Sequence, residues 1–119
     1  MDPAQLDRFA PLKIEYPPES EEIRLLACRH PDVARTQIVR VVQAAHAIRN
    51  DETLRIDLSM RATDEVCVLL GHPNFADDKG DPLPELLKTS FCGRFAGRWD
   101  DPASDAGLAW QVIVRTLEL

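Results

Sequence analysis

Three cysteines and three histidines are the side chains of this sequence best suited to nucleophilic or metal chemistry. They are Cys28, Cys67, Cys92, His30, His46 and His72. A thiolate activated by a nearby histidine can act as a nucleophile, so a small cysteine enzyme is one interpretation of these residues. They are widely spaced, however, and form neither a C-x-x-C pair nor an H-E-x-x-H motif. Buried thiols in a reducing cytosol, with no bound metal, are the expected state.

A second group combines cations with aromatic rings near the C-terminal third of the chain. Arg94, Arg98 and Trp99 could bind an anion or a partner protein. An arginine-aromatic cluster near a helix end is more often a packed corner with a cation-π contact, which is the interpretation we favour. Trp99 and Trp110 are expected to anchor the hydrophobic core, because large aromatic side chains supply much of the buried area in a small domain.

The sequence lacks a phosphate-binding loop of the form G-x-x-x-x-G-K-S/T. Its five glycines also provide no glycine-rich turn between a strand and a helix. We therefore do not expect the 119-residue chain to hydrolyse ATP by itself.

Composition and charge narrow the possible partners. Apolar residues make up 45% of the chain and charged residues 29%, as in an ordinary soluble folded domain. The thiols make a cytoplasmic location the expected one. Fourteen Lys and Arg against 20 Asp and Glu give a net charge of -6, which repels nucleic-acid phosphates. We therefore expect no nucleic-acid partner. No basic N-terminal region is followed by an apolar stretch, and no apolar run is long enough for a membrane span, so no membrane partner is expected either.

The N-terminal segment is predicted to contain one short strand. Apolar and charged residues alternate over residues 10–16, with Leu12, Ile14 and Tyr16 on one face. Pro17 and Pro18 end this strand.

A first helix is predicted over residues 18–29. Its interior residues are expected to be Ile23, Leu26 and Ala27. Its first turn carries Glu19, Glu21 and Glu22. Acidic side chains favour the positive end of the helix dipole, so this cluster is interpreted as a solvated first turn and not as a metal site.

The clearest helical pattern lies at residues 32–49. Apolar residues recur there every three or four positions, at Ile38, Val41, Val42, Ala45 and Ile48. Arg35, Arg40 and Arg49 fall on other faces, as expected of an amphipathic helix. A third helix is predicted after Ser59, a suitable cap, with Arg61 in its first turn and an end at Gly71.

Two more helices are predicted after an exposed, acidic loop at residues 72–84. The first spans residues 83–95, with Leu86, Leu87 and Phe91 facing inward. The second begins at residues 101–102 and carries Leu108, Trp110, Ile113, Val114 and Leu117. The fold class expected from the whole pattern is mainly α, a small helical bundle preceded by one short β-strand.

The order of several motifs resembles MoxR-type AAA+ ATPases (MoxR/CbbQ/NorQ-like). Residues 2–9, Asp-Pro-Ala-Gln-Leu-Asp-Arg-Phe, resemble the stretch that closes the ATPase core. Tyr16-Pro17 followed by Glu21-Glu22 is similar to the passage from the last core strand to the lid. Residues 58–62, Leu-Ser-Met-Arg-Ala, resemble the segment that carries the sensor-2 arginine. The resemblance covers the first half of the chain, and residues 72 onward depart from the commonest lid pattern.

The resemblance assigns roles to two arginines. Arg8 would act in trans as an arginine finger on the ATP of a neighbouring subunit, and Arg61 would act in cis as the sensor-2 residue that contacts the ATP phosphates. A guanidinium suits both roles, because the transition state of phosphoryl transfer spreads negative charge over the γ-phosphate oxygens. The competing interpretation is that Arg8 pairs with Asp7 on the surface, and that Arg61 pairs with Glu65 at i+4.

The resemblance also implies the domains, cofactors and partners. Residues 1–17 would be the end of an AAA+ core, and residues 18–119 its helical lid, with the core in the same polypeptide. ATP and Mg²⁺ would serve the complete protein, with no cofactor for this chain alone. A homo-oligomeric ring, expected to be a hexamer, would remodel a partner or insert a metal or cofactor into it, together with a protein carrying a von Willebrand A domain. The alternative is a stand-alone helical interaction module without nucleotide chemistry, with residues 72–99 as its contact surface.

Overall fold

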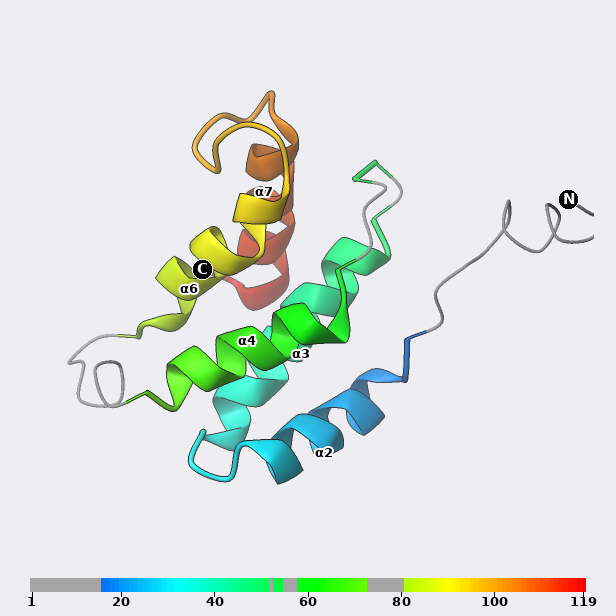
Figure 1. Cartoon of the computed structure of the whole chain (residues 1–119). Coiled ribbons are helices and arrows are strands. Elements are labelled where there is room, and N and C mark those ends of the chain that lie inside the picture. Colours follow the sequence, from blue (N-terminus) through cyan, green and yellow to red (C-terminus); the bar gives the residue numbers. More distant parts are fainter. Residues whose placement is uncertain (1–15, 52, 55–57, 73–80) are drawn as a thin grey trace, which may run out of the picture.

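A computed structural model describes residues 16–51, 53–54, 58–72 and 81–119 of the chain. These residues are mainly helical and contain no strand. The elements are α2 (Glu19–Arg29), α3 (Arg35–Arg49), α4 (Met60–Leu70), α6 (Leu83–Ser90), the 3₁₀ helix η1 (Cys92–Arg94) and α7 (Asp105–Leu117). The predicted helical bundle is therefore confirmed (Figure 1). Arg8, the predicted strand at residues 10–16 except Tyr16, and most of the loop at residues 72–84 lie outside the described residues.

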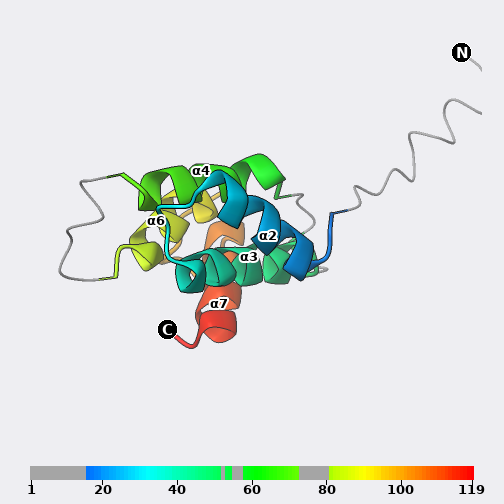
Figure 2. The ribbon, with the colours of Figure 1, turned by 90° about the horizontal axis from the view of Figure 1, so that it is seen from below.

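Helix α3 is the centre of the bundle. It contacts α2, α4, α6 and α7, and Figures 1 and 2 show the other helices arranged around it. Its buried residues face two ways. Val41, Ala44, Ala45 and Ile48 belong to the main core with α4, α6 and α7. Ile38 and Val42 form a second core with Leu26 of α2 and Cys67 of α4. Helix α2 is therefore held against α3 and α4 by a small apolar contact of its own.

Several helix boundaries differ from the predicted ones. Helix α7 begins at Asp105 and not at residues 101–102, because the hydroxyl of Ser104 accepts a hydrogen bond from the backbone N–H of Gly107, at 3.1 Å. Helix α6 ends at Ser90 instead of residue 95, and the chain continues as η1. Ser59 occupies the predicted N-cap position of α4, but its side chain makes no capping hydrogen bond.

The loop between η1 and α7 packs closely against the start of α7. Gly107 allows this approach, since a Cβ at that position would lie 1.8 Å from the carbonyl oxygen of Asp101. Trp99 lies in this loop and is 40% exposed, so the prediction that it anchors the core was wrong.

None of the helices in the described ranges combines the length and apolarity needed to cross a bilayer.

Candidate functional site

Arg61 lies in the first turn of α4, as predicted, and its side chain is exposed. The two residues after it explain this position, since Ala62 and Thr63 are buried against the bundle. The i+4 pair expected as the competing interpretation does not form: Glu65 binds the guanidinium of Arg94 instead, at 2.8 Å. Among the described residues, none forms a hydrogen bond or ion pair with Arg61.

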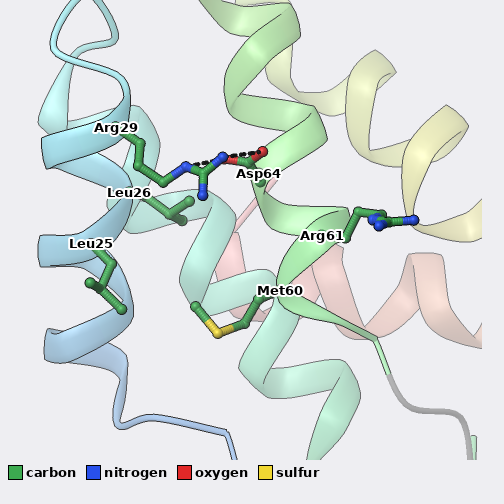
Figure 3. Close-up of a pocket in the computed structure, with 6 residues that line it drawn as sticks. All are labelled: Leu25, Leu26, Arg29, Met60, Arg61 and Asp64. Atoms are coloured by element: carbon green, nitrogen blue, oxygen red, sulfur yellow. Dashed lines mark hydrogen bonds and ion pairs between the residues drawn. The ribbon is translucent and has the colours of Figure 1, made fainter.

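An open cleft of about 310 Å³ separates α2 from α4 beside this arginine. Its lining residues are Leu25, Leu26, Arg29, Met60, Arg61 and Asp64 (Figure 3). Arg29 reaches across from α2, with its Nε 3.1 Å from Oδ1 of Asp64. The ring Nε2 of His30 lies 2.7 Å from the same oxygen. Figure 3 shows the guanidinium of Arg61 directed away from α2, so Arg61 lies at the rim of the cleft and outside the Arg29–Asp64 pair.

A buried carboxylate on α2 forms hydrogen bonds and ion pairs with side chains of α3 and α4. Glu22 is fully buried, and its oxygens lie 2.7 and 3.2 Å from Nη1 and Nη2 of Arg49. The Nε2 of His46 and the hydroxyl of Thr63 are each within 2.9 Å of the same carboxylate. We call these four residues the Glu22 network. The prediction of a solvated acidic turn was therefore wrong for Glu22, which shares the inward face of α2 with Leu26, four residues later.

Arg49 extends this network to two further segments. Its side chain is only 3% exposed, although the sequence pattern placed it on a face other than the apolar one. Its Nε donates a hydrogen bond to the carbonyl oxygen of Leu58, at 2.6 Å, just before α4 begins. Its guanidinium carbon lies 4.1 Å from the centre of the Tyr16 ring, a cation-π contact. One side chain therefore contacts the residues before α2, helix α2 itself and the residues before α4.

The surroundings keep the Glu22 carboxylate ionised. Burial by itself would raise its pKa, because a charge is poorly solvated in the interior. The hydrogen bonds and positive charge of Arg49, with hydrogen bonds from Thr63 and His46, outweigh burial and hold the pKa below its ordinary value of 4.5. At neutral pH the network is consequently a matched pair of buried opposite charges.

The two buried cysteines lack the lowered pKa that an activated thiol nucleophile needs. Cys67 and Cys92 are buried, and burial is the main cause that raises the pKa of their thiols to about 12 and about 11. An activated nucleophile requires the opposite shift. Cys28 is exposed, so the expectation that all three thiols are buried was wrong for this one. Within the described ranges, no group of three or more His, Cys, Asp or Glu residues could hold a metal ion.

The predicted cation-π corner exists, but a lysine supplies the cation. The Nζ of Lys88 lies 4.0 Å from the Trp99 ring and 4.9 Å from the Trp110 ring. Arg98 pairs with Asp100 instead of stacking on Trp99. A second cleft, of about 330 Å³, opens beside Lys88 and Trp99. Since the nearby cations have acidic partners of their own, this corner does not form an anion site comparable to Arg61.

The described residues define a small helical bundle with an unpaired arginine at the rim of an interhelical cleft. Comparison with protein-family models, with curated proteins and with solved structures found no match for this chain. Arg61, the cleft and the Glu22 network are therefore the basis for assigning a function. The sequence pattern predicted Arg61 but missed Glu22 and Arg49. Their one sequence signal is a four-residue spacing from a buried apolar residue on the same helix, Leu26 for Glu22 and Ala45 for Arg49.

Proposed function

We propose that this chain is the helical lid of a MoxR-type AAA+ ATPase, with residues 1–17 as the end of the ATPase core and residues 18–119 as the lid. Arg61 contacts the phosphates of ATP bound to the core, and Arg8 acts in trans on the ATP of a neighbouring subunit. The observation that carries this proposal is the position of Arg61: first turn of α4, exposed, and without an ion-pair partner among the described residues.

Two physical effects support a role for Arg61 in binding phosphate. Its guanidinium is permanently charged and can bind two phosphate oxygens at once. The first turn of a helix also presents the positive end of the helix dipole, which favours an anion. Both effects favour an anion at the N-terminal end of α4. The chain carries a net charge of -6, so the positive charge at Arg61 is a local feature.

The complete protein would bind ATP and Mg²⁺ in its core and assemble as a homo-oligomeric ring, with a hexamer as the expected form. Closing of the lid over ATP would couple hydrolysis to remodelling of a partner protein, or to the insertion of a metal or cofactor into it. A protein with a von Willebrand A domain is the expected co-partner. The chain alone, without a phosphate-binding loop, would be inactive.

The test uses the native ATPase assembly that carries this sequence, with its ATP turnover and ATP affinity measured for three variants. Arg61→Ala should weaken ATP binding or lid closure as well as turnover. Arg8→Ala should abolish hydrolysis and spare ATP binding, because fingers of this kind contribute about a thousand-fold or more to turnover. Arg35→Ala is the matched control, since Arg35 is also an exposed arginine in the first turn of a helix. Unchanged turnover in Arg8→Ala and Arg61→Ala would rule out the assignment.

A stand-alone interaction module is the second candidate. It is favoured by the exposed ring of Trp99, within the 72–99 segment, and by Val68, which is 55% exposed and lines an apolar hollow with Leu69. Purification of the native protein with an antibody against this chain separates the two candidates. A protein of 13.4 kDa without associated ATPase activity would favour the interaction module. Co-purification with ATP hydrolysis would favour the lid.

A further inference from the structure

The start of α4 is held from outside the helix. The Ser59 side chain makes no capping hydrogen bond, so it does not fix the first turn. Instead, the buried residue before it, Leu58, has its carbonyl oxygen bound by Nε of Arg49 at 2.6 Å. Within the first turn itself, the Thr63 hydroxyl lies 2.9 Å from Glu22. Arg61 lies between these two attachments in the sequence, so its position depends on Arg49 and Glu22.

Stability alone does not account for the charges in this location. Moving a carboxylate and a guanidinium out of water is costly, and apolar residues of similar volume often replace a buried ion pair without loss of stability. A fully hydrogen-bonded polar network, in contrast, fixes the relative orientation of its segments because few other arrangements satisfy all its groups. The Glu22 network joins three helices in this way: Glu22 from α2, His46 and Arg49 from α3, and Thr63 from α4.

Arg49 also faces the segment that precedes the lid. The Tyr16 ring covers its guanidinium at 4.1 Å, and Tyr16 lies three residues before α2. A displacement of the chain at residue 16 would therefore move the stacking partner of the side chain that holds Leu58. Leu58 in turn lies three residues before Arg61.

We propose that Arg49 is a positioning residue for Arg61, and that Tyr16 makes this position responsive to the segment joining the core to the lid. The inference rests on the proposed lid function. Arg49 is nearly buried and touches no nucleotide in this role. It sets the direction in which the first turn of α4 presents Arg61, and the segment around Tyr16 transmits movement of the core to that turn.

The first experiment measures hydrogen exchange of the 119-residue chain. The paired variant Glu22→Leu with Arg49→Met removes both charges together, so no unpaired charge remains buried. The backbone amides of residues 62–66, the first amides of α4 that can donate to a carbonyl at its own N-terminal end, should exchange at least about tenfold faster in this variant, because the attachments that hold this end of α4 are lost, whereas amides of α7 should keep their protection. Equal protection of residues 62–66 in the variant and the wild type would overturn the proposal.

The second experiment measures the KM for ATP of the native assembly in a double-mutant cycle. The paired variant should raise KM by about tenfold in the wild-type background, as expected for a misplaced charged contact. In the Arg61→Ala background it should have no further effect, because Arg49 acts only through Arg61. Additive effects of the two changes would overturn the positioning role.

Tyr16 supplies a second, milder perturbation with a matched control. Tyr16→Phe keeps an aromatic face over Arg49 and should raise KM less than Tyr16→Leu, which removes that face. Equal KM values for Tyr16→Leu and the wild type would refute the link to the core. If Arg61→Ala itself changes neither KM nor turnover, the proposed contact of Arg61 with ATP fails. If Arg61→Ala has an effect but the network variants do not, only the positioning role fails.

Discussion

Truncation of Glu22 tests the buried network most directly. Glu22→Ala would leave the guanidinium of Arg49 without its carboxylate in a site where the side chain is 3% exposed. Removing one partner of a buried ion pair typically costs about 3–5 kcal/mol. His46 and Thr63 would lose their hydrogen-bond acceptor as well, so we expect the upper part of that range. Since a domain of this size is stable by about 5–15 kcal/mol, the variant should be close to unfolding.

The assay is thermal and urea unfolding of the 119-residue chain at pH 7, followed by far-ultraviolet circular dichroism. A loss of about 4–5 kcal/mol lowers the melting temperature by about 15–40 °C in a domain of roughly a hundred residues, at about 4–8 °C per kcal/mol. Glu21→Ala is the control, because Glu21 is the adjacent glutamate, is 45% exposed and pairs with Arg24 on the surface. Such pairs contribute about 1 kcal/mol or less. Equal destabilisation by Glu21→Ala and Glu22→Ala would refute the buried ion pair.

The pH dependence of the difference in stability between the wild type and Glu22→Ala provides an independent check. The pKa of Glu22 lies below its ordinary value of 4.5, so the folded state binds this proton less tightly than the unfolded chain does. The stabilisation from Glu22 is therefore present above about pH 4.5 and is lost as the pH falls through the lowered pKa. The stability gap between the wild type and Glu22→Ala should narrow on acidification below that value. A gap that widens would contradict the lowered pKa.

Two further predictions concern packing and thiol reactivity. Gly107→Ala should destabilise the chain by about 1–3 kcal/mol, because its Cβ would overlap a backbone carbonyl of the preceding loop. Gly93→Ala is the control, since no atom lies within 4 Å of the added Cβ, and it should change the unfolding free energy by less than about 1 kcal/mol. Similar effects of the two substitutions in urea unfolding would contradict the close contact. In labelling with an aromatic disulfide at pH 8, Cys28 should react readily, while Cys67 and Cys92 should react slowly until denaturant is added, since burial raises the pKa of both thiols. Fast labelling of either buried thiol would revive the interpretation as a cysteine enzyme.

Apolar periodicity predicted the bundle well because it depends on local geometry. The stripe of α3, from Ile38 to Ile48, is buried as expected, and α4 starts after Ser59 as expected. The position of Arg61 in the first turn of α4 followed from that boundary. Its contact with ATP stays a prediction, as do the role of Arg8 and the strand at residues 10–16.

The Glu22 network could not be predicted from the sequence, because it depends on how the helices cross. A charged residue is assigned to solvent unless a partner is known, and Glu22 and Arg49 are 27 positions apart. The start of α7 was misplaced for a local reason: Pro102 suits a first helical turn, but the bond between Ser104 and Gly107 places the start later. Trp99 was assigned to the core by its size alone, and its loop leaves it partly in water.

The two tryptophans lie together in one half of the bundle, and the single tyrosine lies in the other half. Trp99 and Trp110 are its only indoles, and they lie together, with ring centres 6.0 Å apart and ring planes at 76°. Neither belongs to α2 or α4, the helices that bound the Arg61 cleft. Indole emission therefore reports on α6, α7 and their loop and is silent about the cleft, whereas the single tyrosine, Tyr16, sits on Arg49. The two halves of the bundle therefore carry different natural chromophores.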